Sequence, residues 1–182
     1  MPYKQLFIFL EGDDDERFFK TVVESFVQER YSMIQFWKYS TVKKNRRVNF
    51  IKSINAIGAD YICVGDINDA PCVTTKKEKI TSDFDNKITE NKIIVVVKEI
   101  ESWYLAGLDE NTSKKLGIRE NINTIVMDRI NKEYFNQLIP KKMPRSVFMQ
   151  KILENYDVEI AKGKNRSFRY FMNKWINDGN SV

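Results

Sequence analysis

The sequence predicts an α/β fold, in which four mainly parallel strands alternate with helices. Apolar runs of strand length occur at residues 5–10, 61–65 and 93–97, and residues 32–40 have the composition of a further strand. The segments between these runs repeat apolar side chains at helical spacing or are polar and helix-forming. Strands that alternate with helices form βαβ units and hence a parallel sheet.

The connecting segments follow in order along the chain. Residues 15–31 carry phenylalanines and valines at helical spacing, and residues 48–58 form a short helix closed by Gly58. Residues 74–91 are polar and are expected to be helical. After Gly107 the strand signals fade. Three amphipathic helices are then predicted, at residues 127–139, 145–156 and 166–176.

We therefore expect one domain over residues 1–182, with an α/β core at 1–107 and a helical region at 108–182 packed on it. Hydrophobic residues make up 42% of the chain and charged residues 30%, as in ordinary globular proteins. No apolar run approaches the roughly 20 residues of a membrane helix, and no signal-peptide cleavage site follows the first strand. A cytoplasmic protein without membrane contact is the expectation.

Absent residues exclude several chemistries. The chain has no histidine, which excludes Ser-His-Asp and Cys-His hydrolases and His-ligated zinc enzymes. Two cysteines without metal-ligand spacing disfavour a zinc site. Neither GxxxxGK[ST] nor GxGxxG occurs, so a phosphate-loop ATPase or a dinucleotide-binding fold is disfavoured.

Carboxylates stand where three of the predicted strands end. Glu11 follows the first strand, Asp66 the third, and Glu99 and Glu101 come shortly after the fourth. The carboxyl ends of parallel strands meet at one edge of a sheet, which is where ligand groups collect. Carboxylates crowded together repel each other unless a cation holds them, and oxygen ligands suit Mg²⁺ or Mn²⁺.

Simpler explanations compete at each of these positions. Asp13 and Asp14 are explained by capping of a helix N-terminus, whereas Glu11, which precedes Gly12, is not. The segment 66–71 is also typical of a turn. The alternate spacing of Glu99 and Glu101 lets only one of them point readily at a shared site. Trp103 and Leu105 are expected in the core.

These motifs resemble the TOPRIM domain of topoisomerases, primases and OLD-type nucleases, and more closely the small stand-alone TOPRIM-like proteins of bacteria and archaea. The resemblance covers most of the chain, in short motifs. The matching residues are Glu11-Gly12 with Asp15 and Glu16, Asp66 with Pro71, the segment Glu99-Ile100-Glu101-Ser102-Trp103-Tyr104-Leu105, and the late RSFRYF at 166–171.

The resulting hypothesis is a Mg²⁺- or Mn²⁺-dependent phosphodiesterase, an endonuclease of DNA or RNA. Glu11 and Asp66 are its catalytic residues, and Glu11 handles the proton. The expected metal ligands are Glu11, Asp15, Asp66, Asn68, Asp69, Glu99 and Glu101. Two positions depart from the family pattern: Asp15 replaces a glutamate, and Asn68 replaces the second acid of a DxD pair. The loss of that carboxylate weakens divalent-ion binding unless Asp69 or Glu99 substitutes for it.

Basic residues favour a polyanionic partner. The net charge is +5, and several acids would be used by the metal site. Each basic run is also compatible with a solvated surface. The nucleic-acid contacts that we expect are Lys43, Lys44, Arg46 and Arg47 in one group, and Lys162, Lys164, Arg166 and Arg169 in another.

A second hypothesis is a TOPRIM-like binding subunit that is weakly active or inactive alone. The resemblance implies an ABC- or AAA-type ATPase as a separate partner, because OLD-type TOPRIM domains are coupled to such ATPases, and a role in anti-phage defence. A homo-oligomer is a further expectation. The third alternative is a structural α/β protein whose acids are caps and turns.

Overall fold

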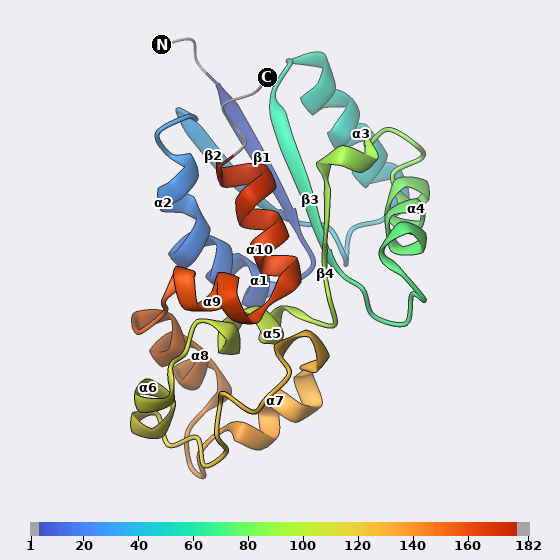
Figure 1. The fold of residues 1–182 in the computed structure, drawn as a ribbon. Helices are drawn as coiled ribbons and strands as arrows, with labels where there is room; N and C mark the ends of the chain where they lie inside the picture. Colours follow the sequence, from blue (N-terminus) through green and yellow to red (C-terminus); the bar gives the residue numbers. More distant parts are fainter. Residues whose placement is uncertain (1–3, 178–182) are drawn as a thin grey trace. The chain divides into compact units, whose positions relative to one another are not determined.

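The computed structural model describes residues 4–177 and divides into two compact units, Met1–Val96 and Val97–Val182. The first unit contains a sheet with helices, and the described part of the second is helical (Figure 1). Helix α5 (Ile100–Ala106) belongs to the second unit, whereas the sequence placed this segment with the α/β core. The expectation of one domain over the whole chain stays a prediction.

The sheet of the first unit has four strands in the order β2-β1-β3-β4. All neighbouring strands are parallel, which confirms the predicted α/β class with a mainly parallel sheet. Residue Leu6 of β1 pairs with Ile34 of β2 and with Asp60 of β3. The strands are β1 (Gln5–Leu10), β2 (Met33–Lys38), β3 (Asp60–Asp66) and β4 (Ile93–Val96).

The connections between these strands are helical. They contain α1 (Asp13–Phe18), the π-helical turn η1 (Phe19–Val23), α2 (Glu24–Val27), α3 (Lys44–Ala56), α4 (Val73–Asp83) and the short 3-10 helix η2 (Glu90–Lys92). The chain moves outward from β1 to β2 and then back past β1 to β3, so right-handed crossovers place α1 and α2 on one face and α3 and α4 on the other. Figure 1 shows this arrangement.

The face of the sheet toward α3 and α4 is the core that positions the site. Phe9 of β1 and Cys63 of β3 are buried there, together with Ile51 of α3 and Ile80 of α4. The ring of Phe9 lies edge-on to that of Phe84, with 5.7 Å between centroids. This apolar contact fixes α4 against the sheet, and so fixes the polar side chains that α4 carries near the strand ends.

The second unit is built around Trp103 of α5. The indole is fully buried, packs against Phe168 and Phe171, and donates a 2.8 Å hydrogen bond to Ser167 Oγ. Leu105 is also fully buried, as expected for a core residue. The other helices are α6 (Glu110–Lys115), η3 (Met127–Arg129), α7 (Lys132–Leu138), α8 (Arg145–Glu154), α9 (Val158–Lys164), α10 (Arg166–Phe171) and the π-helix η4 (Met172–Asn177).

Several predicted boundaries were wrong. Helix α3 begins at Lys44, so the basic stretch forms its first turn. Helix α4 ends at Asp83 because Asp85 and Asn86 adopt positive φ angles, a conformation that these two residue types tolerate in turns. The helix predicted at 127–139 is interrupted before α7, whose N-cap is Asn131. Helices α6 and α9 were not predicted.

Candidate active site at the carboxyl ends of β1 and β3

Glu11 follows the last residue of β1, and its carboxylate lies over the end of β3. A β-carbon added at Gly65 would be 2.9 Å from Glu11 Oε1, and 3.0 Å from both the Tyr39 hydroxyl and Ile80 Cδ1. Only glycine leaves this space, since a real Cβ does not approach other atoms so closely. Asp66, the next residue, ends β3. Two of the predicted acidic strand ends therefore lie at the same edge of the sheet.

Two buried polar side chains contact Glu11. Lys76 Nζ lies 3.3 Å from Glu11 Oε1, and the Tyr39 hydroxyl lies 3.3 Å from the same oxygen. The Tyr39 hydroxyl is also 3.2 Å from the Val64 carbonyl oxygen. Burial, followed by the neighbouring Cys63 and Glu11, raises the pKa of Tyr39 well above its ordinary value. Glu11 is therefore bound by one ammonium and one neutral phenol.

The sequence did not identify Lys76 or Tyr39. Lys76 stands in the polar run TTKKEK, where nothing in the composition separates it from Lys77 or Lys79. One signal was available: Lys76 precedes Ile80 by one helical turn, and Ile80 is a core residue. Helical periodicity therefore indicates that Lys76 faces inward.

Asp15, a predicted metal ligand, caps the helix that begins after Gly12. It is 5% exposed, and its Oδ2 accepts a 3.0 Å hydrogen bond from the Gly12 amide. Its neighbours make surface ion pairs: Asp13 with Lys38, and Asp14 with Arg17. The capping explanation therefore holds for Asp15, and a metal-binding role for Asp15 stays a prediction.

The loop after β3 carries Asn68 and Asp69. Asn68 is exposed, has φ of 49°, and its side-chain amide donates a 3.3 Å hydrogen bond to the Asp66 carbonyl. This is the behaviour of a turn residue. Asp69 is exposed and lines a hollow of about 180 Å³ between this loop and α4, together with Asn68, Thr75, Lys76 and Lys79.

Glu99 and Glu101 belong to the second unit and have partners there. Glu99 accepts a hydrogen bond from the amide of Lys132, the first residue of α7. Glu101 is 4% exposed and forms a 2.5 Å ion pair with Arg145, whose guanidinium stacks over Phe135. Burial raises the pKa of Glu101, although Arg145 opposes this shift. Both carboxylates are thus held by partners within the helical unit.

A divalent metal fits the donor chemistry at the ends of β1 and β3. Glu11 and Asp66 supply carboxylate oxygens, which Mg²⁺ and Mn²⁺ prefer, and the absence of a side chain at Gly65 lets the Glu11 carboxylate reach the end of β3. As the side chains stand, residues 4–177 contain no group of three acidic or cysteine side chains close enough to hold a metal ion. The charge beside Glu11 is instead supplied by Lys76.

The first basic group divides into two kinds of residue. Lys43, the N-cap of α3, is exposed, as are Lys44 and Arg46 in its first turn. Arg47 is half-buried, with its guanidinium over the ring of Phe84 and 3.9 Å from Asp83. Arg47 therefore supports the packing of α3 on α4, and three cations of this group are on the surface.

The second basic group has protein partners at three of its four positions. Lys162 pairs with Glu159, and Arg166 pairs with Asp128. Lys164 donates to the Leu108 carbonyl at 2.6 Å, and burial lowers its pKa. Arg169 is exposed.

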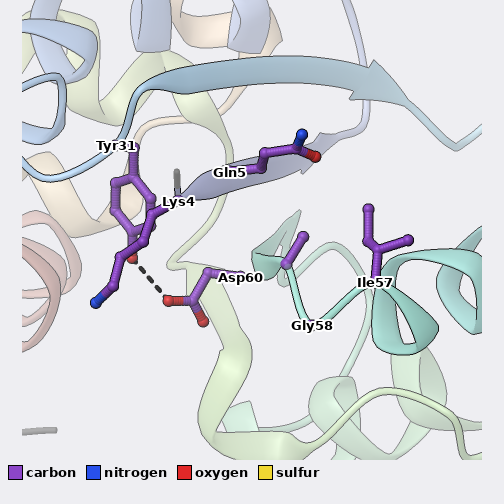
Figure 2. Close-up of a pocket in the computed structure, with 7 residues that line it drawn as sticks. Lys4, Gln5, Tyr31, Ile57, Gly58 and Asp60 are labelled. Atoms are coloured by element: carbon purple, nitrogen blue, oxygen red, sulfur yellow. Dashed lines mark hydrogen bonds between the residues drawn. The ribbon is translucent and has the colours of Figure 1, made fainter. Parts of the chain in front are cut away.

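A second hollow of about 180 Å³ lies at the opposite, amino end of the strands (Figure 2). Asp60 at the start of β3 accepts hydrogen bonds from the Tyr31 hydroxyl at 2.9 Å and from Lys92 at 2.6 Å. Burial and the Asp60 carboxylate raise the pKa of Tyr31 to about 12. These groups satisfy one another, so this hollow is a structural feature of the sheet edge.

Comparison with known proteins identifies the fold. No protein-family model and no curated protein matches the sequence. The structure resembles the C-terminal region of the Burkholderia pseudomallei OLD protein, with a TM-score of 0.57 and 13% identity over 96% of this chain and 99% of that chain. The C-terminal region of the Xanthomonas campestris pv. campestris OLD protein gives a TM-score of 0.51 and 10% identity over 98% of this chain and 96% of that chain.

These likenesses confirm the TOPRIM-like fold that the motifs around Glu11 and Asp66 implied. Identities this low bear on the fold alone. Within residues 4–177, no helix has the length and apolar character needed to cross a membrane.

Proposed function

We propose that this protein is a divalent-metal-dependent phosphodiesterase, an endonuclease of DNA or RNA. The observation that carries the proposal is the position of the Glu11 carboxylate over Gly65, at the strand end that Asp66 closes, in a fold similar to the C-terminal region of OLD proteins. The absence of histidine adds support, because proton transfer then depends on groups such as this carboxylate.

Glu11 and Asp66 are the proposed catalytic residues and the first metal ligands. Mg²⁺ or Mn²⁺, when bound, supplies Lewis-acid chemistry that activates water and neutralises phosphate charge. Glu11 would take up or deliver the proton at its carboxylate, and the Tyr39 hydroxyl orients that carboxylate. Further ligands that we propose are Asp15, Asn68, Asp69, Glu99 and Glu101.

The proposed substrate contact is the exposed first turn of α3. Lys43, Lys44 and Arg46 place three positive charges on the surface there, and phosphate contacts of this kind bind all sequences alike. Arg169, exposed on α10, is a further proposed contact. Three other predicted contacts would bind nucleic acid only after leaving their protein partners: Lys162, Lys164 and Arg166.

The proposal is tested by metal-dependent nicking of supercoiled plasmid and cleavage of single-stranded RNA. We expect activity with Mn²⁺ or Mg²⁺ that chelator abolishes and that Glu11→Gln and Asp66→Asn each reduce at least about a hundredfold, as for groups acting on the reacting atoms. Glu90→Gln, an exposed carboxylate of the same unit, is the matched control. Equal activity of all four proteins would refute the assignment.

A second candidate is a nucleic-acid-binding subunit that works with a separate ABC- or AAA-type ATPase, as the family resemblance implies. The observation in its favour is that Glu11 is already neutralised by Lys76, with no three acids gathered among residues 4–177. Binding of DNA or RNA without cleavage under any metal would support this candidate. A role in anti-phage defence and a homo-oligomeric state stay expectations.

A further inference from the structure

Lys76 is a buried cation at the centre of the candidate site. Its side chain is 8% exposed, that of Glu11 is 24% exposed, and Nζ lies 3.3 Å from Glu11 Oε1. A buried charge is retained at such a position only when another charge compensates it, because removal of one partner leaves the other uncompensated. Lys76 and Glu11 therefore depend on each other for burial.

The burial is specific to Lys76 among the lysines of α4. Lys79, one turn further along the helix, is exposed and lines the same hollow of about 180 Å³. Lys76 also lines this hollow, together with Asn68 and Asp69. A polar space with a carboxylate is thus available to the Lys76 ammonium if it leaves Glu11.

We propose that Lys76 is the charge-balancing cation of Glu11, and that it competes with a divalent ion for this carboxylate. The proposal rests on the function proposed above. In this arrangement the Glu11 charge is neutralised in the metal-free site, so Glu11 stays in place beside its counter-ion. A divalent ion then binds only at the expense of the Lys76 contact, and Lys76 lowers the affinity of the site for metal.

Charge removal at Lys76 should therefore increase metal affinity. We expect Lys76→Met to bind Mn²⁺ roughly tenfold more tightly or better than wild type in calorimetric titration, since one competing charge close to the ligand is removed. Mn²⁺ should also raise the melting temperature of Lys76→Met more than that of wild type, because the ion binds the folded state. Lys76→Arg, which keeps the charge, should retain weak binding.

Three controls accompany this comparison. Lys79→Met removes a charge from the same helix and hollow, and should leave Mn²⁺ affinity unchanged. Glu11→Gln combined with Lys76→Met should lose the gain, because the carboxylate that both cations seek is absent. If Lys76→Met does not fold without metal, Lys76→Gln, which keeps a hydrogen-bond donor, takes its place in every measurement.

The outcomes separate this proposal from the proposed function. Equal Mn²⁺ affinity in wild type and Lys76→Met, or no binding by either, overturns the role of Lys76, and the nicking assay still decides the function by itself. A gain in Lys76→Met that disappears with Glu11→Gln supports the competition, even if no protein cleaves nucleic acid. A gain of the same size in Lys79→Met would show a general charge effect and would overturn the proposal.

Discussion

Glu11 approaches the backbone at Gly65 more closely than a side chain at position 65 would allow. Oε1 of Glu11 lies 2.9 Å from the place that a β-carbon at Gly65 would take. The next-to-last residue of β3 is therefore the one residue type that lets the carboxylate after β1 reach across to β3.

Gly65→Ala should displace the Glu11 carboxylate. The added methyl group meets Glu11, Tyr39 and Ile80 at 3.0 Å or less, and such overpacking costs about 1–3 kcal/mol. We expect this decrease in stability in urea unfolding, together with a smaller Mn²⁺-induced rise in melting temperature. Gly163→Ala is the control, since no atom lies within 4 Å of its added carbon. Unchanged metal response in Gly65→Ala would mean that this contact does not serve the site.

Ser167→Ala should destabilise the helical unit. Ser167 Oγ accepts hydrogen bonds from Trp103 Nε1 at 2.8 Å and from the Val97 amide at 3.2 Å, and donates to Asn165 Oδ1. Each buried group that loses its partner costs about 1–3 kcal/mol. Urea unfolding followed by tryptophan fluorescence measures the effect. The exposed Ser146→Ala should change little, and an equally small effect at Ser167 would contradict the prediction.

Replacement of Lys43, Lys44 and Arg46 by serine should weaken nucleic-acid binding for all sequences alike. The log-log salt slope should become shallower by about 0.9 for each duplex-DNA phosphate that the variant no longer neutralises. Fluorescence anisotropy at several salt concentrations measures both quantities. Arg47→Ser should instead lower stability, because Arg47 contacts Phe84. An unchanged slope in the triple variant would show that this turn is only a solvated surface.

Tyr31→Phe should change the pH dependence of stability. The folded protein holds the Tyr31 proton more tightly than the unfolded chain, with a pKa of about 12 against an ordinary 10.0. The free energy of unfolding should therefore fall as pH rises from 10 to 12, since the folded state binds more protons there.

In Tyr31→Phe, the part of this decrease in the free energy of unfolding that comes from Tyr31 should disappear. At pH 7, removal of the hydrogen bond to Asp60 should lower the free energy of unfolding by about 0.5–1.5 kcal/mol. Urea unfolding between pH 7 and 12 measures both effects. Tyr170→Phe, at an exposed position, controls for general tyrosine ionisation. If the free energy of unfolding of Tyr31→Phe falls as steeply between pH 10 and 12 as that of wild type, Tyr31 is not the group responsible.

Asn68→Asp tests the second position of the acidic pair. Aspartate tolerates the φ of 49° found at Asn68, and it adds a negative charge two residues after Asp66. We expect Mn²⁺ affinity to rise several-fold in calorimetric titration. Asn91→Asp, an exposed position of the same unit, should not change the affinity. If Asn68→Asp also leaves it unchanged, Asn68 is a turn residue and not a ligand.

The sequence was sufficient for the strands and their acidic ends. Apolar runs identified the strands, and parallel pairing then brings Glu11 and Asp66 to one edge regardless of the details of packing. The partners of these acids were harder to predict, because they depend on which side of a polar helix faces the sheet. Lys76 illustrates this, since only its spacing from Ile80 distinguishes it from the exposed lysines.

The acids after β4 show a second limit of the sequence. Glu101 is neutralised by Arg145, and Glu99 accepts a hydrogen bond from the backbone amide of Lys132. Both partners come from distant segments, so no local pattern around Glu99 or Glu101 reveals them. The same holds for Arg47, whose role is set by Phe84, just beyond another helix.

The sheet order β2-β1-β3-β4 also determines when the site can exist during folding. Lys76 follows Glu11 by 65 positions along the chain, and β3, which lies between them in the sequence, must pair with β1 before the two meet. Contacts between such distant segments form late, because the loop must close before they contribute. A nascent chain that has completed only β1 and β2 therefore carries Glu11 without its counter-ion. The ion pair between Glu11 and Lys76 would form together with the pairing of β1 and β3.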